Sequence, residues 1–375
     1  MIAFGITAPG RILFGRGEAA KAPALIRSYG ARGVVVHGAN AGRAAWLTGA
    51  LGPDVLTLAC GGEPTLADLV AALAIARDHR PDWVVALGGG AAIDLGKALA
   101  GLIPASGDPV QHLEVVGQGL QLTADPIPFI AMPTTAGTGA EVTKNAVIGL
   151  PDLGRKVSLR DDRMVARLAI VDPALTDGCP WSVTLASGLD AVTQVIEPYV
   201  SIKATPYTDA LALPAIGPGL AALMRLQAGE DPDARDRLAW TSLCGGLALA
   251  NAGLGAVHGF AGVIGGMTGA AHGAICGALL GPVLTANRAA ASGEPRRKLD
   301  VVCGILAEVL GCTAADAPRA LQSWAQGAGL PGLAGLGVTP ALHEEIVAAA
   351  QGASSMKGNP MSLSPKDLAS ILEAA

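Results

Sequence analysis

The feature of this 375-residue chain that most constrains its fold is a change of sequence pattern near residue 178. Before this point, short β-branched and apolar runs alternate with helical segments; "RGVVVHGA" (32–39) and "LAIVDPAL" (168–175) are two such runs. After it, Ala/Leu-rich helical patterns continue to the C-terminus. Strands that alternate with helices predict a doubly wound parallel sheet. We therefore predict an α/β domain over residues 1–178 and an all-α domain over residues 179–375.

The composition excludes several classes of protein. Hydrophobic residues make up 51% of the chain and charged residues 15%, which is typical of a packed globular protein and not of a disordered one. A net charge of −5 argues against a surface for nucleic acid or anionic membranes. The six cysteines form no CxxC pair, so we expect reduced, mostly buried thiols and a cytoplasmic location.

One long apolar stretch, residues 243–284, has the composition of a membrane span. Three polar residues, Asn251, His258 and His272, interrupt it, and no polybasic flank would fix its orientation. We expect two buried helices joined by a glycine-rich bend, in a soluble chain.

Two glycine-containing loops follow predicted strands. Gly88, Gly89 and Gly90 end the strand in "WVVALGGG" and open a helix, so their backbone amides could approach a pyrophosphate. The spacing is not GxGxxG, and a tight strand-to-helix turn would explain the glycines equally well. The second loop, "MPTTAGTGAEVT", contains three candidate cofactor-binding residues, Thr134, Thr135 and Thr138, although it could simply cap a helix. Both loops together favour a nucleotide site.

A second group of polar residues lies in the predicted helical domain. Asp190 and Gln194 are one helical turn apart in "GLDAVTQVIEPYVS", and His258 and His272 follow in "AVHGF" and "AAHGA". Two imidazoles and a carboxylate are good ligands for a catalytic divalent metal, whereas a neutral amide is a poor one. The residues are compatible with an intact metal site, a damaged one, or a pocket that no longer uses metal.

Taken in order, "GGGAAIDLGK", "PTTAGTGAEVT", "GLDAVTQVIEPYVS" and "HGFAGVIGGMTGAAHG" resemble the iron-containing (group III) alcohol dehydrogenases, in particular the branch that includes the maleylacetate reductases. The resemblance implies a dinucleotide-binding domain, a helical domain and a cleft between them. It also implies hydride transfer between NAD(P)H and a carbonyl, with a metal polarising the oxygen in most members. Family members usually hold the metal through Asp, His, His and His, which correspond here to Asp190, Gln194, His258 and His272.

Gln194 is the most important departure from that pattern. It predicts a weakened or vacated site for Fe²⁺ or Zn²⁺ that keeps the geometry of a reductase. Alternatively, the Gln194 amide could bind the substrate while a protonated His258 or His272 polarises the carbonyl and supplies the proton. We slightly favour this catalysis without metal.

The choice of cofactor depends on the end of the strand at 34–37. An acidic residue near Gly38 would bind the adenosine ribose and repel a 2′-phosphate, but no carboxylate occurs between Ala31 and Leu51. Asn40 and Arg43 lie just beyond the strand, which favours NADP(H) over NAD(H), although Arg43 could merely face solvent.

Two further residues complete the predicted cofactor site. They are Asp94, in the helix after the glycine loop, and Lys156, which corresponds to a family lysine near the nicotinamide ribose and could equally be an exposed hairpin residue.

We therefore predict an NAD(P)H-dependent reductase of an aldehyde or oxo-acid, assembled as a homodimer, with small apolar residues favouring a short substrate. Maleylacetate is a second candidate substrate because Arg155, Lys156 and Arg160 could bind a carboxylate. Two different functions also fit the sequence, an NAD-retaining enzyme of the dehydroquinate-synthase type and a non-catalytic nucleotide-binding protein.

Overall fold

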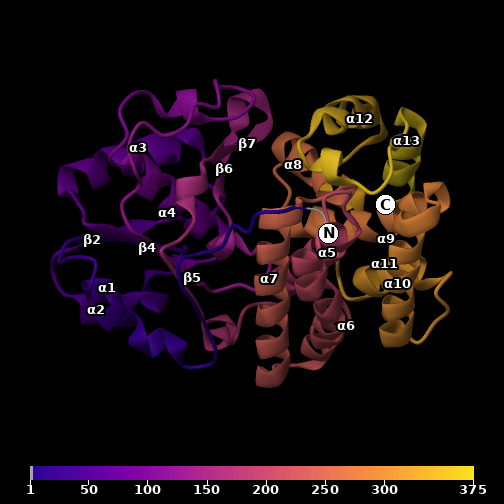
Figure 1. Cartoon of the computed structure of the whole chain (residues 1–375), viewed down its shortest axis with the longest axis horizontal. Helices are drawn as coiled ribbons and strands as arrows, with labels where there is room; N and C mark the ends of the chain where they lie inside the picture. Colours follow the sequence, from indigo (N-terminus) through magenta and orange to yellow (C-terminus); the bar gives the residue numbers. More distant parts are fainter. Residues whose placement is uncertain (1–2) are drawn as a thin grey trace. The chain divides into compact units, whose positions relative to one another are not determined.

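A computed structural model describes residues 3–375, which divide into two compact units (Figure 1). The sheet unit comprises Thr7–Thr135 and Gly139–Asp177. The helical unit comprises Ala136–Thr138 and Gly178–Ala375, with the described N-terminal residues up to Ile6. The main division thus falls at residues 177/178, and the short segment Ala136–Thr138 leaves the sheet unit to pack with the helices.

The sheet unit contains a six-stranded, wholly parallel sheet in the order β1-β8-β5-β4-β2-β3. Helices α1 and α2 lie on one face, and α3 and α4 on the other, which confirms the doubly wound fold (Figure 1). The strands are β1 (Ile12–Phe14), β2 (Gly33–His37), β3 (Val55–Ala59), β4 (Trp83–Gly88), β5 (Phe129–Pro133) and β8 (Leu168–Val171). The helices are α1 (Ala22–Arg27), α2 (Ala45–Leu51), α3 (Leu66–His79) and α4 (Gly90–Leu102).

The central strands are continuous apolar runs because both of their faces are covered. In β2, Val34 and Val36 pack into the core beneath α3 and α4, while Val35 between them packs into the core beneath α1 and α2. Successive side chains of a strand point to opposite faces, so a strand buried on both sides needs apolar residues throughout. The sequence "GVVVH" meets this requirement.

An antiparallel hairpin of β6 (Asn145–Leu150) and β7 (Arg155–Arg160) was not among the predicted strands of the sheet. In β7, the buried residues Val157 and Leu159 alternate with half-buried or exposed polar ones in "RKVSLR". This half-buried alternation differs from the continuous runs of the parallel strands, and a search for β-branched runs overlooks it.

The helical unit contains nine α-helices among the described residues, around one hydrophobic core. Ser364 caps the last helix and accepts a hydrogen bond from the amide of Asp367, with Pro365 in the first turn. The helices are α5 (Trp181–Val200), α6 (Pro206–Ala228), α7 (Pro232–Ala252), α8 (Ala256–Thr268), α9 (His272–Ala290), α10 (Gly293–Leu310), α11 (Ala317–Gly327), α12 (His343–Gly352) and α13 (Pro365–Ala374).

The apolar stretch 243–284 forms parts of three helices and not two, so that prediction was wrong. It covers the end of α7, all of α8 and much of α9, with breaks at Gly253 (φ 68°) and Gly269 (φ 70°). Positive φ angles end a helix, and glycine adopts them without steric cost. By length and composition alone, α6 could cross a membrane, as could α7 and α8 if they were one span, but α7 and α8 are bent by 99° and half of the α6 window is buried.

Candidate metal centre and dinucleotide site

Three neighbouring strands of the sheet unit end at the same edge, and each is followed by predicted cofactor-binding residues. His37 of β2 pairs with Leu87 of β4, and Gly88 of β4 pairs with Pro133 of β5. The loops after these strands therefore begin side by side. The chain order of the strands reverses between β2 and β4, and ligands of doubly wound sheets bind at such a switch point.

The glycine loop permits close packing at this edge. A Cβ atom on Gly88 would lie 2.5 Å from the Cβ of Ala92 and 3.3 Å from the amide nitrogen of Gly38, so no side chain fits there. Gly89 is the N-cap of α4 and provides no side-chain hydrogen bond to it. The first amides of α4, beginning at Gly90, are therefore available to an anion such as a pyrophosphate.

The second loop adjoins the first. The amide of Thr134 donates to the carbonyl oxygen of Gly88 (2.9 Å), and a Cβ atom on Gly89 would lie 3.3 Å from Oγ1 of Thr135. The structure therefore brings together the glycines, Gly38 and two of the three predicted threonines. Thr138 belongs instead to the segment that packs with the helical unit.

The remaining predicted cofactor residues have partners within the chain. Oδ1 of Asn40 accepts the amide of Gly42, and the guanidinium of Arg43 donates to the carbonyl oxygen of Leu175 (2.7 Å). Lys156 lies on β7 and forms an ion pair with Glu63. The Lys156 side chain is only 12% exposed, so the alternative of an exposed hairpin residue was wrong.

Asp94 lies on α4 and is half-buried. The negative charge of Asp94 contributes to the raised pKa of the Cys60 thiol, although burial of that thiol is the main cause.

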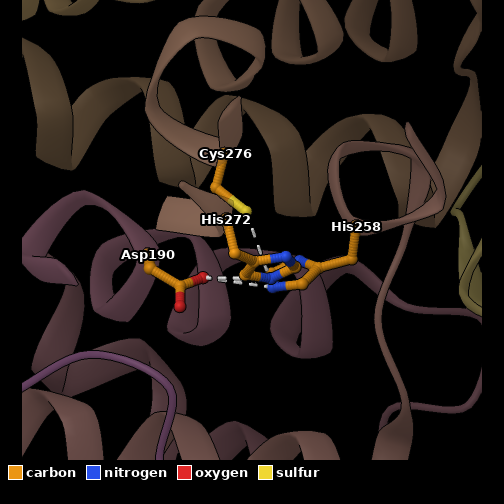
Figure 2. A group of neighbouring side chains, drawn as sticks. All are labelled: Asp190, His258, His272 and Cys276. Atoms are coloured by element: carbon orange, nitrogen blue, oxygen red, sulfur yellow. Dashed lines mark hydrogen bonds and ion pairs between the residues drawn. The ribbon is translucent and has the colours of Figure 1, made fainter. Parts of the chain in front are cut away.

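In the helical unit, Asp190 of α5, His258 of α8, and His272 and Cys276 of α9 converge (Figure 2). One potential ligand atom from each lies within 4.8 Å of the other three. Oδ1 of Asp190 is 3.2 Å from Nε2 of His258 and 4.0 Å from Nε2 of His272, and Sγ of Cys276 is 3.9 Å from Nε2 of His258. The His272 side chain is 32% exposed and the Asp190 side chain 1%, so the cluster is accessible at His272.

Glycines on α9 allow this convergence. A Cβ atom on Gly273 would lie 2.3 Å from the carbonyl oxygen of Ala186, and one on Gly277 would lie 2.6 Å from Cδ1 of Leu189. The start of α9 therefore packs directly on the backbone of α5. His272 and Cys276, one turn apart on α9, are brought to Asp190 by this contact.

Glu197 holds His258 in place, a role that the sequence analysis missed. Its Oε2 accepts a hydrogen bond from Nδ1 of His258 (2.7 Å), and its Oε1 accepts the amide of Val257 (2.7 Å). A carboxylate on Nδ1 fixes the imidazole and directs Nε2 at the cluster, as behind many metal-binding histidines. The spacing Asp190, Gln194, Glu197 on one helix face is the signal that could have revealed it.

The electrostatics of the cluster suit a cation. Burial alone would lower the pKa of His258, but interactions with Cys276, Asp190 and Glu197 raise it well above its usual value. His272 is affected in the same sense: despite burial, Cys276 and Asp190 raise its pKa to about 9. Burial opposes ionisation of Asp190, yet His258, His272 and Gln194 keep its pKa below the usual value.

Two buried oxygens at this site, Oδ2 of Asp190 and Oε1 of Gln194, have no hydrogen-bond partner among the described residues. Buried acceptors are rarely left unpaired, and a bound cation would satisfy them. Carboxylate, imidazole and thiolate are all established ligands of divalent metals. The residues therefore fit the metal that the sequence pattern implied, with Cys276 as an additional candidate ligand.

Comparisons with known proteins match both units to one family. Residues 9–173 match the iron-containing alcohol dehydrogenase family, and residues 184–375 match the C-terminal part of the same family. The probable alcohol dehydrogenase EutG of Salmonella typhimurium is 36% identical over 286 residues, 71% of each chain. The 4-hydroxybutyrate dehydrogenase of Cupriavidus necator is 32% identical over 324 residues, 83% of this chain and 82% of that one.

A solved structure of sulfoacetaldehyde reductase from Bifidobacterium kashiwanohense, in complex with NAD⁺, superposes with a TM-score of 0.86 at 25% identity, covering 100% of this chain and 98% of that one. The matched regions contain the glycine loop in one unit and the Asp190 cluster in the other. The chain is a member of the iron-containing alcohol dehydrogenase family.

Proposed function

We propose that this protein is an NAD(P)H-dependent oxidoreductase that interconverts a short aldehyde and its alcohol with the help of a divalent metal. The observation that carries the proposal is the buried cluster of Asp190, His258 and His272, whose donor atoms converge beside two unpaired oxygens. The sequence alone led us to favour catalysis without metal. The convergence of donors leads us instead to propose a metal site.

The two units supply different parts of the proposed site: one binds the cofactor and the other binds the metal. The amides at the start of α4 bind the pyrophosphate, and Asp190, His258 and His272 hold the metal. A bound divalent cation would act as a Lewis acid that polarises the substrate oxygen. Reduction moves a hydride from NAD(P)H to the carbonyl carbon and a proton to the oxygen. Solvent supplies the proton, and it reaches the cluster beside His272, whose side chain is 32% exposed.

NADP(H) use is supported by the end of β2. A Cβ atom on Gly38 would meet nothing within 4 Å, so the position offers open space and no carboxylate that would repel a 2′-phosphate. The Bifidobacterium relative was solved with NAD⁺, and we propose that this chain accepts both cofactors. The Gly38→Asp variant should shift kcat/KM toward NADH; a wild-type enzyme that strongly prefers NADH would contradict the proposed tolerance.

The basic residues near the hairpin favour a small neutral substrate. Lys156 pairs with Glu63, and Arg160 pairs with Glu114, so two of the three cations proposed for a substrate carboxylate already have partners. A hydroxy acid is the second candidate, because the Cupriavidus relative is a 4-hydroxybutyrate dehydrogenase. Maleylacetate, with two carboxylates, is the least favoured.

Oxidation of NADH and NADPH with butanal, succinic semialdehyde and maleylacetate tests the proposal. We expect stoichiometric oxidation, fastest with butanal, and its loss after chelation with recovery on adding metal. Fastest turnover of maleylacetate would establish that substrate instead. Undiminished activity after complete metal removal would restore the metal-free mechanism, and product formed without net oxidation of the cofactor would indicate an NAD-retaining enzyme.

The homodimer, the cytoplasmic location and the lack of nucleic-acid or membrane partners stay predictions. Analytical ultracentrifugation of the full chain, with added DNA or anionic vesicles in separate samples, would test the assembly and partner predictions.

A further inference from the structure

We propose that Cys276 is a ligand of the metal and takes the place of the histidine that Gln194 replaces. The inference rests on the proposed metal site and assigns it a ligand set of one carboxylate, two imidazoles and one thiolate. Such a set prefers a thiophilic cation such as Zn²⁺.

Geometry is the first argument. Donor atoms that share a zinc ion at about 2.0–2.3 Å lie roughly 3.3–3.8 Å from one another in a tetrahedron. Nε2 of His258 is 3.2 Å from Oδ1 of Asp190 and 3.9 Å from Sγ of Cys276. Small movements of the side chains therefore complete a tetrahedron, and Figure 2 shows Cys276 and Asp190 directed at the two imidazoles.

Charge is the second argument. The cluster is buried, with Asp190 and Cys276 almost inaccessible, so an uncompensated charge there would be costly. A dication held by Asp190, Gln194 and two neutral imidazoles leaves one positive charge. With the Cys276 thiolate as a ligand, the two anionic ligands balance the dication. Glu197 adds a further negative charge behind His258, outside the ligand set. Among the direct ligands, charge balance favours the thiolate over the amide.

Placement on the helices is the third argument. Cys276 lies one turn after His272 on α9, and Gly273 and Gly277 hold this turn against α5. Gln194 lies one turn after Asp190 on α5. A Cβ atom on Gly245 of α7 would lie 3.0 Å from the Cβ of Gln194, so α7 packs closely against Gln194. We assign Gln194 to the support of Asp190, next to the metal ligands, and its unpaired Oε1 to a hydrogen bond from a water or substrate hydroxyl bound beside the metal.

Cobalt binding by the full-length protein tests the ligand directly. The apoprotein is titrated with Co²⁺, and a thiolate ligand adds a charge-transfer band in the near ultraviolet. We expect this band in the wild type and in Cys303→Ser, which changes a buried cysteine elsewhere in the helical core. It should be absent from Cys276→Ser, whose Zn²⁺ affinity should fall by at least the roughly 10–100-fold that loss of an outer-shell partner usually costs. The loss should be greater for Cd²⁺ than for Mn²⁺.

A second variant tests the proposal even if Cys276→Ser does not fold. If Gln194 leaves the metal one ligand short, Gln194→His adds a direct ligand and should tighten Zn²⁺ binding by at least the roughly 10–100-fold that an outer-shell partner contributes. With Cys276 already bound, the gain should stay below about threefold, under 1 kcal/mol. A large gain with Cys276 in place would overturn the proposal.

Two further outcomes would also overturn the assignment: Co²⁺ bound by the wild type without the band, or a band that persists in Cys276→Ser. Oxidation of NAD(P)H by the same preparations separates this inference from the proposed function. Turnover without the band would remove only Cys276 from the ligand set. The band without turnover of any carbonyl substrate would remove only the reductase activity.

Discussion

Each unit of this protein contains buried charged side chains, Lys97 in the sheet unit and the Asp190 cluster in the helical unit. The two differ in whether the chain supplies all of their hydrogen-bond partners. In the sheet unit, Lys97 is fully buried and its ammonium donates to the carbonyl oxygens of Ala140 (2.6 Å) and Asn145 (2.9 Å) and to Oγ1 of Thr143 (2.9 Å). In the helical unit, the cluster around Asp190 leaves two buried oxygens unpaired. A buried charge that the chain itself satisfies is structural, whereas one left incomplete indicates an external partner.

The Lys97 contacts also explain how the second glycine-containing loop is held. Lys97 lies on α4, and its three acceptors lie in the loop after β5 and at the start of β6. One ammonium therefore fastens this loop to the helix that opens with the first glycine loop. Glu141 is the exception, because its Oε1 has no partner and burial raises its pKa to about 7, despite the nearby charge of Lys97.

The largest effect is expected from Lys97→Met. The substitution leaves three buried acceptors unpaired, each at a cost of about 1–3 kcal/mol, so we expect a total loss of about 3–5 kcal/mol. Hydrogen exchange of the amides in α4, β5 and β6 should report the loss.

Lys144→Met is the matched control for this variant. Lys144 pairs with the exposed Asp162, and loss of a surface pair should cost about 1 kcal/mol or less. Equal losses in both variants would show that the buried contacts of Lys97 are not structural.

The next largest effect is expected from Glu197→Gln, which should weaken metal binding at the Asp190 cluster of the helical unit. The amide keeps the shape of Glu197 but removes the charge that holds Nδ1 of His258. We expect Zn²⁺ affinity to fall by roughly 10–100-fold, as loss of a carboxylate behind a metal-binding histidine usually does. Competition with a chromophoric chelator measures the affinity, and Glu308→Gln, an exposed change on α10, is the control. Unchanged affinity would mean that His258 does not bind the metal.

The two regions also differ in how far the sequence predicted them. The glycine and threonine loops follow continuous apolar strands, and in a parallel sheet such loops must meet at one edge, so Gly38, Gly89 and Thr134 could be placed from local pattern alone. Asp190, His258 and His272 were grouped by residue type as candidate metal ligands, and the family resemblance then assigned them to ligand positions.

Cys276 and Glu197 were not recognised as parts of the site, because their proximity depends on how α5, α8 and α9 pack. Cys276 resembles any buried thiol in sequence. Only the contacts of Gly273 and Gly277 with α5 bring it to Asp190.

The three helices of residues 243–284 depend on backbone breaks at Gly253 and Gly269 that an apolar pattern does not encode. The hairpin of β6 and β7 was overlooked because its half-buried alternation differs from a continuous apolar run.

The smallest predicted effect concerns Glu141, the buried carboxylate near Lys97 whose Oε1 has no partner among the described residues. Because burial raises its pKa from 4.5 to about 7, the folded protein binds a proton that the unfolded chain has released. The stability from this group is therefore fully present below about pH 4.5 and is lost as the pH rises through about 7. The pKa of Lys97, which burial lowers to about 8, lies above this window, so its opposite contribution appears only at higher pH.

Glu141→Gln should remove this dependence. Between pH 5 and 6.5, the wild type should lose about 1–2 kcal/mol more stability than the variant in urea titrations followed by circular dichroism. Glu114→Gln removes an exposed carboxylate of the same unit, so a general effect of lost negative charge would appear in both variants. If the pH dependence of Glu141→Gln equals that of the wild type, Glu141 is charged in the folded protein over this range. The satisfied region would then contain an ionised pair with Lys97, and its contrast with the Asp190 cluster would rest on the hydrogen bonds of Lys97 alone.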